Sequence, residues 1–315
     1  MDKNILILGA SGQIGTELAL YLKQLYPNAN IVASDIKAGI PELMDSTTFE
    51  FLDATDIAKT KAIIAKHQIN EVYIMAAMLS AVAEKTPMKA WDLNMTILLN
   101  MLTIAKELKG IKLFWPSSIA VFGKTTPKTA KQYTVTEPNT VYGISKLSGE
   151  RWCEYYKNNY NVDIRTIRYP GIISWKVEAG GGTTDYAVDI FYKALANNNY
   201  DCFLAKDTML PMMYMDDALK ATTAIMAHDS FDKYTPYNVA AMSFSPAELA
   251  QTIQKEIPDF SISYTPDERQ QIADTWPEVF EDDFAKKDWN WQADFDIEKM
   301  TQLMLSHLKN KLQIN

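Results

Sequence analysis

The sequence predicts an α/β protein with a doubly wound, mostly parallel sheet. Over the first half of the chain, short apolar runs alternate with helix-like stretches about every 30 residues, the spacing of right-handed βαβ units. The first run, residues 5–8, is continuously apolar, as in a strand covered on both faces by helices. A glycine-rich turn follows and leads into a stretch with helical periodicity, so a strand–turn–helix unit begins at residue 5.

The remaining elements follow from apolar spacing and capping residues. Ile14, Leu18, Leu22 and Leu25 repeat at helical intervals, and Asp56 is a suitable N-cap for a second helix. On these grounds we expect strands at residues 5–8, 31–35, 49–53, 71–77, 112–115 and 163–168, and helices at 14–25, 56–67, 87–108 and 142–160.

The alternation breaks after Pro170. Glycines at 180–182 indicate a loop, residues 183–195 have a helical pattern, and residues 201–204 suit a further strand. We therefore expect two interleaved domains with no linker to mark their boundary. The larger would comprise residues 1–172 plus about 215–242. The smaller, about 173–214 and 243–315, would bind substrate at the carboxyl edge of the sheet.

Composition excludes several classes of function. With a net charge of −8 and a pI near 5.1, the chain lacks the clustered Lys and Arg that nucleic acid or an anionic membrane requires. Its two cysteines form no CxxC pair, so we expect neither a metal site nor a disulfide. No stretch approaches the roughly 18 apolar residues of a membrane span. We expect a cytoplasmic protein with neither a nucleic-acid nor a membrane partner.

The glycines Gly9, Gly12 and Gly15 have the spacing of a dinucleotide-binding turn. Such glycines let the backbone approach a pyrophosphate, and the helix start beyond them supplies N–H groups. A tight strand–helix turn without a ligand has the same pattern, so the match alone is weak. Here a buried strand precedes it, and Asp35 ends the next strand about 20 residues on, where a ribose diol would lie. The sequence therefore predicts a Rossmann-type domain.

Two aspartates at strand ends bear on the cofactor. The Asp35 carboxylate can accept two ribose hydroxyls but repels a 2′-phosphate, which favours NAD over NADP. Lys37 is near, so NADP is not excluded. Asp53, at the end of the third strand, is in position to reach the adenine edge, although a loop or capping role is equally compatible with its place.

Tyr142 and Lys146 are spaced so that both lie on one face of a helix. A tyrosine has a pKa near 10 and is a poor base at neutral pH. An ammonium group and a positive nicotinamide ring beside it would stabilise the phenolate. An exposed helical pair has the same spacing, but a serine at the end of the fifth strand, Ser118, could hold a substrate oxygen. Together these residues suit removal of an alcohol proton.

These motifs together resemble the extended short-chain dehydrogenase/reductase superfamily, also called the NAD-dependent epimerase/dehydratase family. The resemblance covers essentially the whole chain and implies NAD as the cofactor. It implies that Tyr142, Lys146 and Ser118 are catalytic. The cofactor-binding residues it implies are Gly9, Gly12, Gln13, Ile14, Gly15, Asp35, Asp53, Ala76, Ala77, Asn94, Tyr142, Lys146, Tyr169 and Pro170.

Within the superfamily, the segment at 210–217 separates two classes of substrate. Sugar-nucleotide epimerases and dehydratases carry an arginine that pairs with the diphosphate at the position where this chain has Leu210. The stretches at 77–81, 170–175, 180–189 and 272–277 resemble instead the short-chain family of L-threonine 3-dehydrogenases. That family oxidises the threonine 3-hydroxyl with NAD to give 2-amino-3-oxobutyrate.

The second resemblance implies further residues and a partner copy. Thr183 and Ser80 would contact the carboxylate or amino group of L-threonine, whereas Thr184 and Asp185 could equally cap a helix. The substrate-binding residues it implies are Ser80, Ser118, Tyr142, Thr183, Thr184 and Asp185. A homodimer through the helices at 87–108 and 142–160 is also implied. The alternatives are a sugar-nucleotide epimerase or dehydratase, and an NAD-binding sensor without catalysis, which the intact Tyr142–Lys146 pair disfavours.

Overall fold

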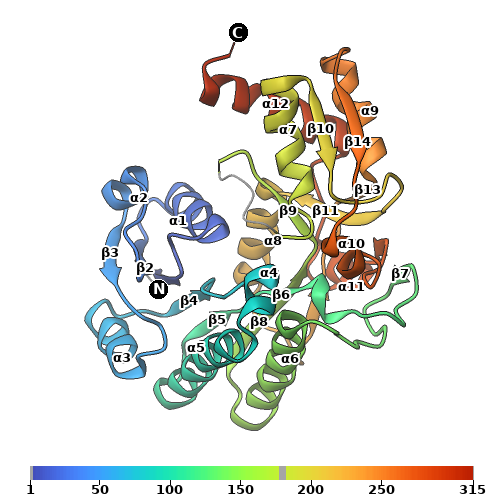
Figure 1. The fold of residues 1–315 in the computed structure, drawn as a ribbon. Coiled ribbons are helices and arrows are strands. Elements are labelled where there is room, and N and C mark those ends of the chain that lie inside the picture. The colour runs from blue at the N-terminus through green and yellow to red at the C-terminus, as the bar shows by residue number, and fades with distance from the viewer. Residues whose placement is uncertain (1–2, 177–181, 315) are drawn as a thin grey trace. The chain divides into compact units, whose positions relative to one another are not determined.

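The computed structural model describes residues 3–176 and 182–314, with the backbone alone at 80–81 (Figure 1). The chain divides into two compact units, each built from separated stretches. The first comprises Met1–Ser118, Ile144–Arg168 and Leu219–Tyr237. The second comprises Ile119–Gly143, Tyr169–Ala218 and Asn238–Asn315. Both units are therefore discontinuous in sequence, and the stretch before Tyr142 belongs with the second.

The first unit is built on the main sheet. Its strands lie in the order β12-β8-β5-β4-β1-β2-β3, with β6 paired to β8, and the neighbours from β8 to β3 are parallel. The bounds are β1 (Asn4–Leu8), β2 (Asn30–Asp35), β3 (Thr48–Phe51), β4 (Glu71–Ile74), β5 (Lys112–Phe114), β6 (Ser117–Ser118), β8 (Asp163–Tyr169) and β12 (Pro236–Asn238).

The strand order reverses beside β1. Strands β2 and β3 continue from it on one side, while β4, β5 and β8 continue on the other. In open α/β sheets, ligands bind in the crevice beyond the carboxyl ends of the strands at such a switch point. The turn after β1 and the segment after β4 therefore border the expected cofactor site. This arrangement confirms the predicted doubly wound parallel sheet.

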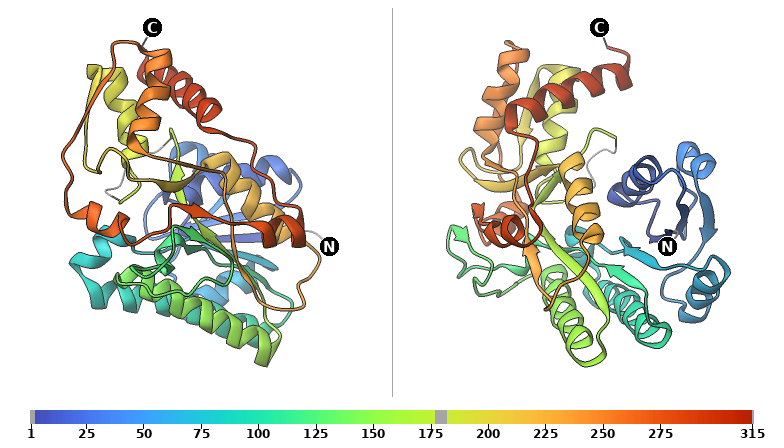
Figure 2. Two further views of the ribbon diagram at one scale, coloured as in Figure 1. Left: turned by 90° about the vertical axis from the view of Figure 1, so that its right-hand side faces the viewer. Right: turned by 180° about the vertical axis from the view of Figure 1, so that it is seen from behind.

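Helices flank this sheet. Their bounds are α1 (Gln13–Leu25), α2 (Pro41–Ser46), α3 (Ile57–Lys66), α4 (Ser80–Lys85), α5 (Pro87–Leu108), α6 (Val141–Tyr160) and α8 (Met215–Ala227). Helices α5 and α6 run side by side on one face, as Figures 1 and 2 both show. Gly149 on α6 permits close packing there, because a Cβ at that position would lie 2.3 Å from the Trp115 ring. The core beneath these helices contains Leu98, Leu102 and Cys153.

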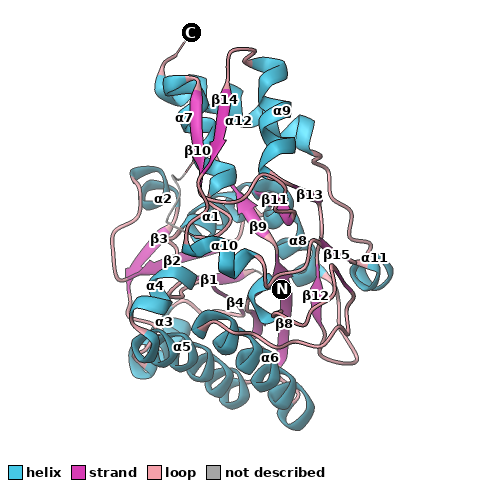
Figure 3. Ribbon diagram, turned by 45° about the vertical axis from the view of Figure 1, so that its right-hand side comes forward, coloured by secondary structure: helices cyan, strands magenta, loops and turns pink. Residues whose placement is uncertain are grey.

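Among its described residues, the second unit contains three small sheets (Figure 3). It has its own apolar core. Strands β9, β11 and β13 form one sheet, β10 pairs with β14, and β7 pairs with β15. The strand bounds are β7 (Thr129–Ala130), β9 (Gly171–Ile173), β10 (Asn199–Cys202), β11 (Leu210–Tyr214), β13 (Met242–Phe244), β14 (Ser261–Tyr264) and β15 (Val279–Phe280). Its helices are α7 (Tyr186–Asn197), α9 (Pro246–Glu256), α10 (Glu268–Ala273), α11 (Asp283–Trp289) and α12 (Ile297–Leu312), besides a 3-10 turn at Ile119–Val121.

Several predicted bounds are wrong in detail. The strand expected at 71–77 ends at Ile74, and the helix expected from residue 183 begins at Tyr186. The helices α2 and α4 were not predicted, because six residues are too few to establish a period. The expected N-cap Asp56 is confirmed: its carboxylate accepts the Lys59 amide at 3.0 Å. Among the described residues, no helix combines the length and apolarity required to cross a membrane.

Candidate active site

The glycine turn brings two backbone segments together without side chains between them. Gly9 has a φ of +85°, and a Cβ there would lie 2.5 Å from the backbone nitrogen of Ala76. A Cβ on Gly15 would lie 2.1 Å from the Gly9 carbonyl oxygen. Larger residues at either place would force the turn away from the segment after β4, or α1 away from the turn. The fold therefore requires glycine at both positions.

The start of α1 is left open by the same turn. Gly12 is its N-cap and offers no side-chain oxygen to the first-turn amides. Gln13 and Ile14, the first helical residues, are half-buried beside it. Amides at a helix start carry partial positive charge and bind phosphate oxygens. The residues present therefore fit the pyrophosphate of a dinucleotide.

Asp35, the last residue of β2, is held in a fixed orientation by the turn. Its Oδ2 accepts the Ser11 amide at 3.0 Å, and its Oδ1 accepts the Lys37 amide at 3.1 Å. Ser11 also donates its hydroxyl to the Lys37 carbonyl at 3.0 Å. Each carboxylate oxygen keeps a further lone pair for a ribose hydroxyl. The ribose role of Asp35 stays a prediction.

Asp53 has a local structural role in this structure. Its Oδ1 accepts both the amide and the hydroxyl of Thr55, at 2.9 and 2.7 Å. These bonds, led by the hydroxyl, lower the pKa of the Asp53 carboxyl below its ordinary value. The side chain is exposed and stabilises the turn before α3. Its predicted contact with adenine stays a prediction.

The segment after β4 is held by Asn94 on α5. The Asn94 Oδ1 accepts the Met78 amide at 2.8 Å, and its Nδ2 donates to the Met78 carbonyl at 3.1 Å. Ala76 and Ala77 lie directly before this clamp, both half-buried. Asn94 therefore fixes the backbone of the segment after β4, and its predicted role toward the cofactor stays a prediction. Ser80 begins α4, and its side chain lies outside the described residues.

Lys146 lies in the interior of the first unit. It is 3% exposed, donates from Nζ to the Pro116 carbonyl at 2.5 Å, and lies 4.5 Å above the Trp115 ring centre. Burial lowers the pKa of the Lys146 ammonium to about 7, because a desolvated charge is disfavoured. Tyr142 precedes it by one turn near the start of α6, and Ser118 ends β6; both are half-buried.

The residues predicted to bind substrate in the second unit lie just before α7. Thr183 is 3% exposed. The Thr184 methyl packs against Gly171, where a Cβ would come within 2.7 Å of it. Asp185 occupies the N-cap position but makes no side-chain cap; its Oδ2 accepts the amide of Gly182 at 2.7 Å. Helix capping by the Asp185 side chain is thus absent, and it stabilises the preceding turn instead.

Three further residues named in the sequence analysis, at the end of β8 and the start of β11, are buried. Tyr169 ends β8 and Pro170 follows it, and both are buried. Leu210 begins β11 and is fully buried. A buried leucine at this position cannot neutralise a diphosphate.

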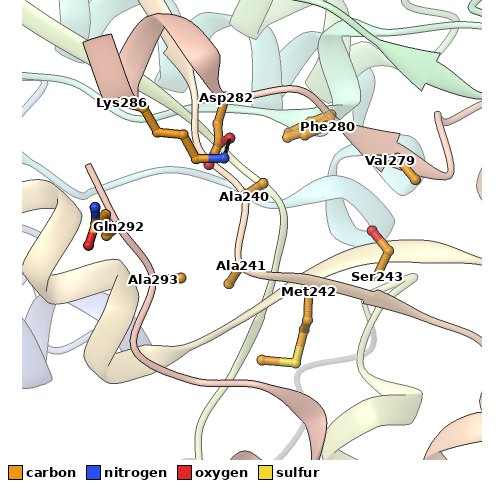
Figure 4. A pocket seen from close by; sticks show the side chains of 10 residues that line it. All are labelled: Ala240, Ala241, Met242, Ser243, Val279, Phe280, Asp282, Lys286, Gln292 and Ala293. Atoms are coloured by element: carbon orange, nitrogen blue, oxygen red, sulfur yellow. Dashed lines mark ion pairs between the residues drawn. The ribbon is translucent and has the colours of Figure 1, made fainter. Parts of the chain in front are cut away.

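A pocket of about 620 Å³ lies elsewhere in the second unit, beside β13 and β15 (Figure 4). Asp282 and Lys286 line it and form an ion pair of 2.6 Å, and Phe280 and Met242 contribute apolar side chains to the lining. None of the site residues predicted from sequence is among its lining residues. Over the described ranges, 3–176 and 182–314, no three His, Cys, Asp or Glu residues group as metal ligands.

One group of residues near Lys146 was not predicted from sequence. Glu150, one turn beyond Lys146, accepts from the Ser117 hydroxyl and from the Arg168 guanidinium, and all three side chains are buried. The recurrence of polar side chains every four residues along α6 was the available signal. It does not reveal the partner strand, because Arg168 lies far away in sequence.

Comparison with known proteins decides the family. Residues 5–240 match the model of the NAD dependent epimerase/dehydratase family. The chain belongs to this family. An uncharacterized epimerase/dehydratase of Staphylococcus haemolyticus is 43% identical over 99% of both chains.

Solved structures extend the comparison. The holo form of a GalE-like L-threonine dehydrogenase from Cupriavidus necator is 48% identical, with a TM-score of 0.94 over 97% of this chain and all of that one. A monomeric L-threonine 3-dehydrogenase from a metagenome is 46% identical, with a TM-score of 0.92 over 98% and 99% of the two chains. The chain is thus an NAD-dependent oxidoreductase, and its cofactor is NAD.

The geometry of Asp35 generates a test of cofactor choice. Asp35→Asn removes the charge that is predicted to attract ribose hydroxyls and repel a 2′-phosphate. We expect the dissociation constant for NAD to rise about 10–100-fold, as for a lost hydrogen bond to a charged group, while that for NADP changes less or falls. Calorimetric titration with both cofactors measures this, with the exposed Asp45→Asn as the matched control. An unchanged NAD/NADP ratio would contradict the role of Asp35.

The burial of Lys146 generates a pH-dependent test. Its folded pKa of about 7 lies below the unfolded 10.5, so the unfolded chain binds more protons between these values and stability rises with pH. Lys146→Met lacks this contribution. The unfolding free energy of wild type minus that of Lys146→Met should therefore increase from pH 7 to 9, by at most about 1.4 kcal/mol per pH unit.

Urea unfolding without NAD at pH 6 to 9 measures this difference. Lys89→Met, on the exposed surface of α5, is the control and should give a difference independent of pH. A flat difference for Lys146→Met as well would show that its ammonium is not desolvated.

Proposed function

We propose that the chain oxidises the 3-hydroxyl of L-threonine to 2-amino-3-oxobutyrate with NAD. The observation that carries this proposal is the likeness, at 43–49% identity over nearly the whole chain, to solved structures named as L-threonine dehydrogenases. The buried Leu210 supports it, because a sugar nucleotide would require a cation for its diphosphate. A UDP-glucose 4-epimerase of Thermotoga maritima, 19% identical, shares only the fold.

The chain's own residues can carry the proton chemistry of this reaction. Bound NAD supplies the hydride acceptor. The proposed cofactor-binding residues are the glycine turn with Gln13 and Ile14, Asp35, Asp53, Ala76, Ala77, Asn94, Tyr169 and Pro170. The Tyr142 phenolate would take the hydroxyl proton, and Ser118 would hydrogen-bond the same oxygen. Lys146 would hold the nicotinamide ribose, and its ammonium would favour the phenolate.

Recognition of the amino acid falls to a few hydroxyls and backbone amides in this proposal. Thr183 and Ser80 would contact the carboxylate or ammonium of L-threonine. Thr184 is more simply explained by its packing on Gly171, and Asp185 by its bond to the Gly182 amide. Both would then support Thr183 by fixing the turn before α7.

Turnover with L-threonine tests the proposal directly. Purified chain with NAD and L-threonine should release NADH, followed at 340 nm, whereas an epimerase recycles its hydride and shows no net NADH. Tyr142→Phe should lower kcat by about 10²–10⁴-fold, the usual contribution of a general base, while NAD binding persists. Tyr133→Phe, exposed in the second unit, is the control. Wild-type turnover in Tyr142→Phe, or no NADH from the unaltered chain, would refute the proposal.

We also propose a homodimer formed through α5 and α6. The exposed surface of these helices contains Leu108, Trp152, Tyr155 and Tyr160, each 40–50% exposed. The Trp152 ring contacts the Tyr155 ring, and the Tyr155 ring contacts the Tyr160 ring. The Lys106 ammonium lies 3.8 Å from the centre of the Tyr160 ring. Aromatic residues gathered on one surface are typical of interfaces between subunits.

Light scattering after size exclusion tests the dimer. The unaltered chain should have twice its sequence mass, and Tyr155→Asp should have the monomer mass with a similar thermal midpoint. Tyr133→Asp, also exposed but in the second unit, should stay dimeric. Because one similar protein is named as monomeric, a monomeric wild type is the outcome that would refute this proposal.

A further inference from the structure

Two consecutive residues before Ser118 are tied to α6 by side chains one helical turn apart. The Pro116 carbonyl accepts from the Lys146 ammonium at 2.5 Å. The Ser117 hydroxyl donates to Glu150 Oε1 at 2.6 Å. Residues four apart on a helix lie above one another, so the segment runs along α6 and meets it at two successive levels. Ser118 is the next residue in the chain.

Glu150 is itself fixed by a second strand. The Arg168 Nε donates to Glu150 Oε1 at 2.8 Å, and its Nη2 donates to Oε2 at 2.7 Å. Glu150 is fully buried and Arg168 is 4% exposed. Arg168 lies on β8, which pairs with β6, the strand of Ser117 and Ser118 (Figure 1). A bidentate pair leaves the carboxylate no freedom to rotate.

The energetics favour positioning over stability as the role of this pair. A buried ion pair is on average no better for stability than apolar side chains of similar volume, because desolvation offsets the attraction. What the pair supplies is a defined geometry, since short charge-assisted hydrogen bonds tolerate little displacement. Here three such bonds converge on one carboxylate, and one of them leads to the residue before Ser118.

The charge of Glu150 also affects the protonation of Lys146. It lies one turn from Lys146, and its negative charge favours the ammonium form, against the effect of burial. Glu150 is therefore linked to two residues with proposed catalytic roles. It acts on Lys146 through its charge and on Ser118 through its hydrogen bond with Ser117.

We propose that Glu150, fixed by Arg168, is a positioning residue that sets the place of Ser118 relative to Lys146. Its catalytic consequence rests on the proposed function, whereas its structural effect can be measured without substrate. Loss of the Ser117–Glu150 hydrogen bond, or of the Glu150–Arg168 pair, should let the stretch from Pro116 to Val121 move relative to α6. A displacement of about 1 Å in such a group can cost about 100-fold in rate.

Two variants test the proposal. Ser117→Ala removes one link and leaves the Glu150–Arg168 pair intact. Glu150→Met combined with Arg168→Met replaces the pair by apolar side chains and conserves net charge. The control is Thr223→Val on α8, which removes a buried hydroxyl that donates to the Leu219 carbonyl. For each we would measure amide hydrogen exchange in peptides covering residues 115–122, the dissociation constant for NAD, and kcat and KM for L-threonine.

We expect faster exchange at 115–122 and at least a tenfold fall in kcat in both variants, with NAD binding within about twofold of wild type. Thr223→Val should change neither. Unchanged exchange in Ser117→Ala would overturn the positioning role, even if the double variant does not fold. Faster exchange with wild-type kcat would overturn the catalytic consequence. If the unaltered chain does not oxidise L-threonine, the proposed function fails while the exchange data still decide the positioning role.

Discussion

The close approach of backbone to backbone at the glycine turn is the constraint on which the cofactor site depends. Gly9 leaves no space for a side chain beside Ala76, and Gly15 leaves none beside Gly9. Because of these contacts, α1 begins directly at the switch point of the sheet, with its first amides open. The same turn supplies the Ser11 amide that orients Asp35. In the proposed mode of NAD binding, phosphate binding and ribose recognition would therefore share one backbone arrangement.

Much of this could be predicted from sequence, because the signals are local. The continuous apolar run of β1, the glycine spacing and the long periods of α5 and α6 each lie within a few turns of chain. The short helices α2 and α4 were missed because six residues do not establish a period. The strand at 71–77 was predicted too long, since Met75, Ala76 and Ala77 continue its apolar character after its pairing ends.

For the candidate site, some residues could be predicted from sequence and others could not. Gly9, Gly15 and Asp35 are in surroundings that fit the predicted roles, because those roles follow from local spacing. The side chains of Asp53 and Asp185 are engaged by their own turns, which residue type alone does not reveal. The Glu150–Arg168 pair could not be predicted, because it depends on β8 lying beside β6. Buried polar pairs between distant segments are known only once the topology is known.

The interleaving of the two units has a consequence for synthesis of the chain. The first unit requires Leu219–Tyr237, which follows two of the three stretches of the second unit in sequence. A chain emerging from the ribosome therefore cannot complete its first unit until Tyr237 has been made, long after the glycine turn. Until then, β8 lacks its partner strand β12, and the nascent chain is open to chaperones.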